Sequence, residues 1–170
     1  MEITAVYADG GVIGANPSPI GGTWAYVHVD AGGVVVARDS AVVTPRPSVP
    51  LITNNLTEMI ALVRALAALP AGWAGHVYSD SQITLGRLFL GWKMQGIPPV
   101  LIKQGAAALE RLDIPHIRWT LLDGHPTKAQ LLAGVGKRGN PVSVHNVTCD
   151  QECGRLAREF AALRQELQHA

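Results

Sequence analysis

Four acidic residues stand out by their type and their placement along the chain. They are Asp9 in YADGG, Glu58 in TNNLTE, Asp80 in YSDSQ and Asp150 in HNVTCDQECGRLA. Carboxylates gathered from distant parts of a chain repel one another unless a cation lies between them, and hard ions such as Mg²⁺ prefer oxygen ligands. Two such ions about 4 Å apart form the usual clamp for in-line cleavage of a phosphodiester. These residues therefore predict a metal-dependent nuclease.

The segments around these residues predict an α/β fold. Apolar, β-forming runs predict strands over residues 3–8, 23–29 and 34–43, joined by short turns that favour antiparallel pairing. Helical spacing predicts a helix over 55–69, with Asn55 as N-cap and Glu58 in its first turn. Further strands are predicted over 76–79 and 117–122, with helices from Ser81 and over 100–112 between them. The result is a five-stranded mixed sheet, three antiparallel then parallel strands, with helices on both faces.

The last third of the chain is predicted to be a long loop followed by one helix. Residues 123–147 carry no clear periodicity, and a loop this long in a compact domain is usually functional or mobile. The final helix is predicted to begin near Val147 and to bury a stripe of Leu156, Phe160, Leu163 and Leu167. No linker or repeat divides the chain, so residues 1–170 are expected to form one domain.

Composition narrows the class of protein. Hydrophobic residues make up 48% and charged residues 16% of the 170, which supplies a core and excludes disorder. No stretch approaches the roughly 20 apolar residues that span a bilayer, and the N-terminus lacks the basic segment of a signal peptide. Cys149 and Cys153 are expected to be free thiols in a reducing cytoplasm. A net charge of +1 does not indicate a nucleic-acid binder, although bound metals would add positive charge.

Taken in order, these motifs resemble those of one known family. The segments YADGG, TNNLTE, YSDSQ, Gly124-His125 and the pattern N-x-x-x-D-x-x-x-x-x-L-A, which starts at Asn146, are similar to ribonuclease H type I. No single motif is decisive, because D-G-G and S-D-S are common strings, but their order and placement carry the match. The resemblance implies hydrolysis of the RNA strand of RNA–DNA hybrids, leaving 3′-hydroxyl and 5′-phosphate ends, with two Mg²⁺ or Mn²⁺ ions. We expect a monomer with no membrane partner.

The resemblance also implies a role for each residue of the site. Asp9 would bridge two metals, Glu58 and Asp80 would complete the metal on the leaving-group side, and Asp150 would hold the metal that carries the attacking water. His125 would assist turnover and product release. These five residues are the predicted catalytic set.

A second group of residues is expected to contact the substrate. The resemblance places Asn54, Asn55 and Gln82 along the hybrid's minor groove and Thr53 against the DNA strand. Amide side chains both donate and accept hydrogen bonds, so they suit the 2′-hydroxyls of that groove. Gly11 and Trp92 are further candidates, the latter because an indole beside Lys93 suits a sugar–phosphate surface.

The chain departs from the family in two places. The basic protrusion found in many members is reduced here to Lys93 and Lys103 in LGWKMQGIPPVLIKQG. His125 and Asp150 also lie 25 positions apart, farther than is usual, so His145 is an alternative for the catalytic histidine. The intervening residues 126–145 either bring Lys137 and Arg138 to the substrate or form a solvated turn.

Other interpretations remain open for the single residues and for the whole. Asp9 could be a turn residue, Glu58 part of a capping box with Asn55, Asp80 a helix cap and Asp150 a first-turn charge. His125, His145, Cys149 and Cys153 could bind zinc, although structural zinc ligands usually come in two separated pairs. For the whole protein, the alternatives are a DNA-processing nuclease, such as a Holliday junction resolvase or exonuclease, and a non-catalytic binding module.

Overall fold

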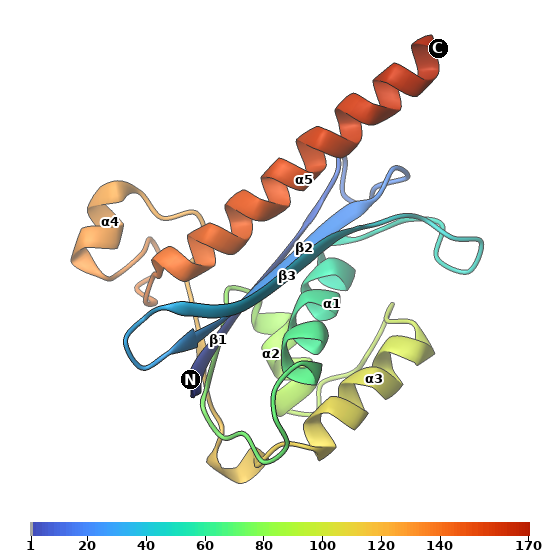
Figure 1. Cartoon of the computed structure of the whole chain (residues 1–170). Helices are drawn as coiled ribbons and strands as arrows, with labels where there is room; N and C mark the ends of the chain where they lie inside the picture. The colour runs from blue at the N-terminus through green and yellow to red at the C-terminus, as the bar shows by residue number, and fades with distance from the viewer. Residues whose placement is uncertain (1) are drawn as a thin grey trace.

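The computed structural model describes residues 2–170, and its five strands form one mixed sheet (Figure 1). The strands are β1 (Ile3–Val12), β2 (Gly22–Asp30), β3 (Val35–Val43), β4 (His76–Ser79) and β5 (Arg118–Leu121), in the spatial order β3-β2-β1-β4-β5. β1–β2 and β2–β3 pair antiparallel, whereas β1–β4 and β4–β5 pair parallel. The predicted sheet is therefore confirmed.

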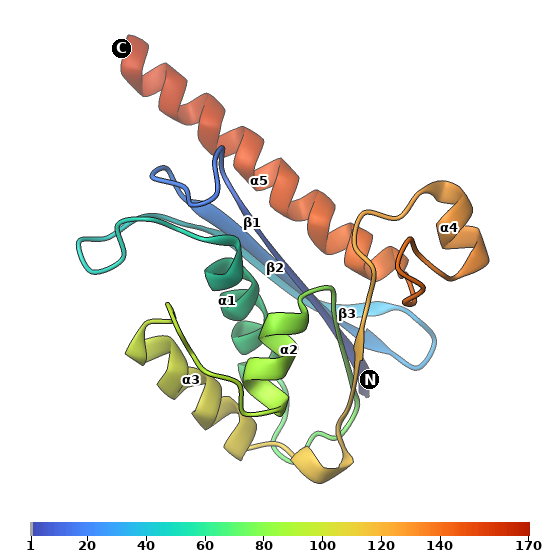
Figure 2. The ribbon, with the colours of Figure 1, turned by 180° about the vertical axis from the view of Figure 1, so that it is seen from behind.

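Helices cover both faces of this sheet, as predicted. They are α1 (Asn54–Ala67), α2 (Gln82–Phe89), α3 (Pro99–Glu110), α4 (Lys128–Ala133) and α5 (Val144–His169), with a 3₁₀ turn at Ile114–His116. The first three lie on one face, and α5 crosses the other and runs past the sheet (Figures 1 and 2). Within residues 2–170, no helix is both long and apolar enough to cross a membrane.

The main core lies between the sheet and α1. Met59, Leu62 and Leu66 of α1 are almost fully buried, and their spacing of three and four residues places them on one helix face toward the sheet. A smaller cluster under α5 includes Tyr7, Val27 and the two thiols Cys149 and Cys153. Because both faces are covered, β2 is buried along almost its whole length.

The register of the parallel strands fixes where two predicted site residues lie. Ala8 of β1 pairs with Ser79 of β4, so Asp9 and Asp80 are the next residues along two neighbouring parallel strands. Only β4 ends there: β1 runs on to Val12 against β2, four residues beyond the predicted end of the first strand. Both residues therefore lie at the carboxyl edge of the parallel pairing, where α/β sheets place their ligands.

A glycine contact brings the third acidic residue to the same edge. A Cβ on Gly10 would lie 2.4 Å from the backbone carbon of Thr57 and 2.5 Å from the backbone nitrogen of Glu58. Real Cβ atoms do not approach backbone this closely, so the first turn of α1 can pack on β1 only because residue 10 has no side chain. Glu58 is thereby held next to Asp9.

Three local predictions are wrong. The N-cap of α1 is Thr53 rather than Asn55, because the Thr53 hydroxyl accepts from the backbone of Leu56. The predicted loop over 123–147 contains α4. This helix begins with a capping box between Thr127 and Gln130 and ends at Gly134, its C-cap. Since Ser143 caps α5, that helix begins at Val144 rather than near Val147.

The predicted buried stripe on α5 is also wrong. Leu163 and Leu167 are 54% and 70% exposed, and Leu156 and Phe160 are only half-buried. The buried residues of α5 are Asn146, Cys149 and Cys153, because only the first half of the helix lies over the sheet.

The contact at Gly10 gives a prediction for stability. Gly10→Ala should lower the free energy of unfolding by on the order of 1–3 kcal/mol, the usual cost of forced overpacking. Thermal and urea unfolding measure the change. Gly32→Ala is the matched control, because a Cβ there would meet only the Asp30 carboxylate at an ordinary 3.4 Å. Equal stability of the two variants would mean that β1 and α1 are not held this closely.

Candidate active site

Three of the predicted carboxylates form a compact cluster at the carboxyl edge of the sheet. One side-chain oxygen from each of Asp9, Glu58 and Asp80 lies within 4.8 Å of the others. Asp9 and Glu58 are 4% and 8% exposed, and Asp80 is half-buried. Asp9 comes from β1, Glu58 from the second turn of α1, and Asp80 directly follows β4. The tertiary structure thus joins residues that lie up to 71 positions apart in the chain.

The surroundings of this cluster disfavour its negative charge. Burial, together with the charge of Asp80, raises the pKa of Asp9 well above its ordinary value. Burial and the charges of Asp9 and Asp80 do the same to the pKa of Glu58. Burial also raises the pKa of Asp80, although a hydrogen bond from Asn146 opposes the rise. Without a compensating cation, the folded protein therefore holds these carboxylates at an electrostatic cost.

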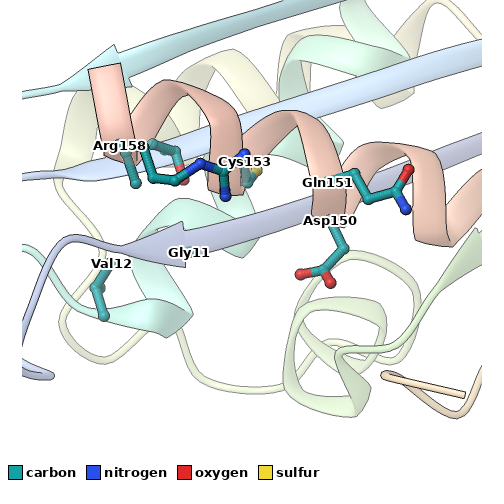
Figure 3. Close-up of a pocket in the computed structure, with 9 residues that line it drawn as sticks. Gly11, Val12, Asp150, Gln151, Cys153 and Arg158 are labelled. Atoms are coloured by element: carbon teal, nitrogen blue, oxygen red, sulfur yellow. The ribbon is translucent and has the colours of Figure 1, made fainter. Parts of the chain in front are cut away.

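Asp150 lies beside this cluster on α5. Figure 3 shows its side chain projecting from α5 toward β1. Its negative charge contributes to the raised pKa of both Asp9 and Asp80, so it belongs to the same electrostatic site. The side chain of Asp150 is 45% exposed, which makes it the most open of the four carboxylates.

Of the two candidate histidines, the structure brings His125 to the site. Its Nδ1 atom lies 3.4 Å from Oδ2 of Asp150, and its side chain is 83% exposed. His125 has φ = 49°, a left-handed backbone that costs a non-glycine residue stability and is often found at functional sites. The ring of His145 instead lies against Tyr7, with ring centroids 5.0 Å apart.

Two neighbours of Asp80 were not among the predicted site residues. Nδ2 of Asn146, which is buried, donates to Oδ2 of Asp80 at 3.2 Å. A Cβ on Gly124 would lie 2.8 Å from the same oxygen, so the backbone before His125 runs against the carboxylate. The N-x-x-x-D pattern contained the signal for Asn146, because it lies one helical turn before Asp150 on α5.

Asp123 anchors the inserted segment, residues 126–143, beside the site. The Asp123 carboxylate accepts hydrogen bonds from the backbone of Arg138 and from both nitrogens of Asn140. Val135 and Pro141 form a β-bridge across the turn, and Lys137 and Arg138 are exposed at its tip. The sequence predicted Asp123 only as a loop residue. Its anchoring role could not be predicted, because its hydrogen-bond partners lie 15 and 17 residues farther along the chain.

Several of the predicted substrate contacts lie on or beside the elements that carry the carboxylates. Asn54, Asn55 and Gln82 are exposed at the starts of α1 and α2. Thr53 uses its hydroxyl to cap α1. Gly11 lines a pocket together with Asp150, shown in Figure 3.

The indole of Trp92 is partly exposed but also packs against α2. A Cβ on Gly86 would lie 2.1 Å from the indole, so the ring packs against α2 and keeps 42% of its surface exposed.

The structure argues against two of the simple structural interpretations. Ser81, not Asp80, caps α2, since its hydroxyl accepts from the backbone of Thr84. Glu58 forms no capping box, because Thr53 caps α1 and Oε2 of Glu58 is buried without a hydrogen-bond partner. The residues of the possible zinc site do not come together either. His125 faces Asp150. The two thiols lie against β1, where Sγ of Cys149 is 3.7 Å from the carbonyl oxygen of Tyr7 and Sγ of Cys153 is 3.7 Å from that of Asp9.

The donor set fits a hard divalent cation. It consists of carboxylate oxygens, one of which is buried and has no hydrogen-bond partner among residues 2–170. Oxygen ligands of this kind suit Mg²⁺ and Mn²⁺. The class that these features define is an α/β protein with a mixed sheet and a carboxylate cluster that could hold a divalent cation.

Comparisons with known proteins agree with this class. The family model described as RNase H matches residues 1–157. A ribonuclease H of Methylorubrum extorquens is 32% identical over 151 residues, which are 79% of this chain and 60% of the relative. The chain thus spans less than two thirds of that relative. A ribonuclease H of Thermosynechococcus vestitus is 30% identical over 162 residues, covering 86% of this chain and 96% of the relative.

Solved structures show the same fold. The N-terminal RNase H domain of a Mycobacterium tuberculosis protein superposes with a TM-score of 0.65 at 17% identity, covering 96% of this chain and 99% of that one. LC11-RNase H1, solved in complex with an RNA/DNA hybrid, gives a TM-score of 0.51 at 24% identity, covering 71% and 85%. Because the RNase H family model matches residues 1–157, the chain belongs to the ribonuclease H family, and the resemblance seen in its motifs is confirmed.

The raised pKa values give a prediction for the metal-free protein. A carboxylate with a raised folded-state pKa binds more protons in the folded than in the unfolded state, so its contribution to stability is present at low pH and is lost as pH rises through the folded pKa. Glu58→Gln removes one of the repelling charges. In EDTA at pH 8 this variant should melt higher than the wild type, by roughly 2–4 °C for each kcal/mol gained, and the difference should shrink as pH falls.

Calorimetry at several pH values measures this difference. Glu110→Gln is the matched control, because Glu110 lies at the end of α3, outside the cluster. Millimolar Mg²⁺ should raise the melting temperature of the wild type more than that of Glu58→Gln, since the variant has lost a ligand. A Glu58→Gln variant that is less stable than the wild type in EDTA at pH 8 would contradict the repulsion that we describe.

Proposed function

We propose that this protein is an endoribonuclease that hydrolyses the RNA strand of RNA–DNA hybrids and leaves 3′-hydroxyl and 5′-phosphate ends. The observation that supports it most is the cluster of Asp9, Glu58 and Asp80 at the carboxyl edge of the sheet, with Asp150 beside it. Its membership of the ribonuclease H family gives the reaction type, and the hybrid bound by LC11-RNase H1 gives the substrate class.

The four carboxylates would hold two Mg²⁺ or Mn²⁺ ions. When bound, such ions neutralise charge on the phosphate and activate an attacking water. Buried Asp9 and Glu58 would give fixed ligands, because their elements are locked together at Gly10. Asn146 orients Asp80 through its hydrogen bond, and the more exposed Asp150 would contribute the ligand on the solvent side.

His125 would exchange a proton at the open side of the site. Its Nδ1 atom faces Asp150, and the ring lies largely in solvent, so it can turn between the carboxylate and the departing product. Its place after Gly124, which contacts Asp80, keeps it close to both carboxylates.

Substrate contacts would follow from the residues exposed around the cluster. Asn54 and Asn55 at the start of α1 and Gln82 at the start of α2 can donate to and accept from 2′-hydroxyls and base edges without sequence preference. Thr53, Gly11 and Trp92 would complete this surface.

The wider context of the enzyme is also a proposal. Residues 1–170 would form one ribonuclease H-like domain, and a monomer would be sufficient, because all four carboxylates come from one chain. The two unpaired thiols are consistent with a reducing cytoplasm.

The substrate prediction is tested by a cleavage panel. An end-labelled RNA–DNA hybrid, duplex RNA, duplex DNA and a four-way junction are each incubated with the protein in Mg²⁺ and in Mn²⁺. Only the RNA strand of the hybrid should be cut, and Asp80→Asn should lower kcat by at least about 1000-fold, because it removes the charge of a metal ligand while keeping its shape.

Circular dichroism and melting of Asp80→Asn show whether the fold is retained. Asp113→Asn is the matched control, since Asp113 is bound to His116 far along the chain from the cluster. Cleavage of the junction or of DNA instead of the hybrid would contradict the proposal and identify the protein as a DNA-processing nuclease. Substantial activity of Asp80→Asn would remove Asp80 from the site.

The choice between the two histidines gives a separate prediction. His125→Ala should lower kcat on the hybrid by on the order of 100-fold, the lower end of the range for proton-transfer groups. His145→Ala should change kcat little, because its ring packs on Tyr7 and has no contact with the carboxylates. Single-turnover and steady-state rates measure both effects, and the opposite ranking would assign the role to His145.

A further inference from the structure

A pocket next to Asp150 is not used by the proposed mechanism. It has a volume of about 380 Å³ and lies between the end of β1 and the α5 helix (Figure 3). Gly11 and Val12 line one side, and Asp150, Cys153, Gly154 and Arg158 line the other. Apart from Asp150, its one charged side chain is Arg158.

Arg158 reaches back along α5 toward Asp150. Asp150, Gly154 and Arg158 are spaced by four residues, so they share one face of the helix. A Cβ on Gly154 would lie 3.3 Å from Nη1 of Arg158, which places the guanidinium over Gly154. Figure 3 shows the Arg158 side chain running along the helix in the direction of Asp150. Gly154 itself is four residues, or about 6 Å along the axis, from Asp150.

The guanidinium has no competing partner among residues 2–170. Arg158 forms neither an ion pair nor a side-chain hydrogen bond, and it is exposed. Its neighbour Arg155 contrasts with it, because Arg155 is bound by Glu152 and by Glu159. Arg158 is therefore an available cation on the wall of an open pocket that also contains a candidate metal ligand.

The chemistry of this arrangement suits one ligand class. A guanidinium presents several N–H donors in a planar fork that matches two oxygens of a phosphate. We infer that the pocket is a phosphate subsite in which Arg158 binds a backbone phosphodiester of the cleaved strand, next to the one held at the four carboxylates. The absence of side chains at Gly11 and Gly154 leaves room for that phosphate and for the arginine. This inference rests on the proposed function, because it takes the nucleic acid to lie across Asp150.

Three variants test the subsite in the full chain. Arg158→Ala should raise KM for the hybrid by about tenfold or more, the usual effect of losing a hydrogen bond to a charged group, and should change kcat less. Arg158→Lys should recover part of the loss, since it keeps the charge but not the fork. Arg155→Ala is the matched control: it removes a cation from the same helix that is already paired, and KM should stay within about twofold of the wild type.

A modified substrate separates direct binding from a structural effect. One hybrid carries a neutral methylphosphonate at the phosphate beside a single cleavable site, and another carries it several nucleotides away. The nearby replacement should weaken binding to the wild type but add little to Arg158→Ala, whereas the distant replacement should affect both proteins equally. The slope of log affinity against log salt, measured in the Asp80→Asn background, should fall by somewhat under one unit on loss of Arg158.

The outcomes distinguish this inference from the proposed function. If the wild type cleaves the hybrid but Arg158→Ala has the same KM, salt slope and methylphosphonate response, the subsite is wrong and the nuclease assignment stands. If the wild type cleaves no hybrid, the proposed function fails and the subsite fails with it. Melting temperatures of Arg158→Ala and Arg155→Ala equal to that of the wild type confirm that neither result comes from unfolding.

Discussion

The repulsion among four carboxylates is the constraint on which the rest of this structure depends. Asp9, Glu58 and Asp80 lie within 4.8 Å of one another, and Asp150 adds its charge from α5. Burial, together with like charges nearby, raises the pKa of all three clustered residues, so keeping them ionised in the folded protein opposes folding. The surrounding fold has to supply the free energy that holds them together, and a bound cation would relieve the repulsion.

Rigid packing under the cluster supplies that free energy. α1 approaches β1 and β2 so closely that neither Gly10 of β1 nor Gly22 of β2 has room for a Cβ, and both glycines lie against Thr57, the residue before Glu58. Behind this contact lie Met59, Leu62 and Leu66, which are almost fully buried against the sheet. Asp9 and Glu58 are thus attached to elements of the main core, where a displacement of the backbone would disturb the packing.

The open side of the site is built differently. The side chains of Asp150 and His125 are 45% and 83% exposed; Asp150 lies on the first half of α5, and His125 directly precedes the segment that Asp123 anchors. α5 contributes few buried side chains, and its second half runs beyond the sheet with Leu163 and Leu167 exposed. The helix, which lies across one face of the sheet, therefore serves mainly to position polar groups: Asn146 donates to Asp80, Asp150 lies beside the cluster, and Arg158 lines the neighbouring pocket. A rigid inner half and an accessible outer half agree with the proposed function, in which the site would hold metal and release product.

The sequence by itself determined the family and the five strands and singled out four carboxylates as candidate ligands, because each of these depends on local periodicity or on a short motif. It also indicated Asn146 through the N-x-x-x-D pattern, although not its bond to Asp80. Tertiary structure alone decided that His125 rather than His145 meets Asp150, because 25 residues separate the pair and the Asp123 anchor sets the path of the chain between them. It likewise decided that the apolar stripe of α5 stays largely exposed and that Arg158 turns toward the site. Helical spacing shows which residues share a face, but the extent of the sheet determines how much of that face is covered.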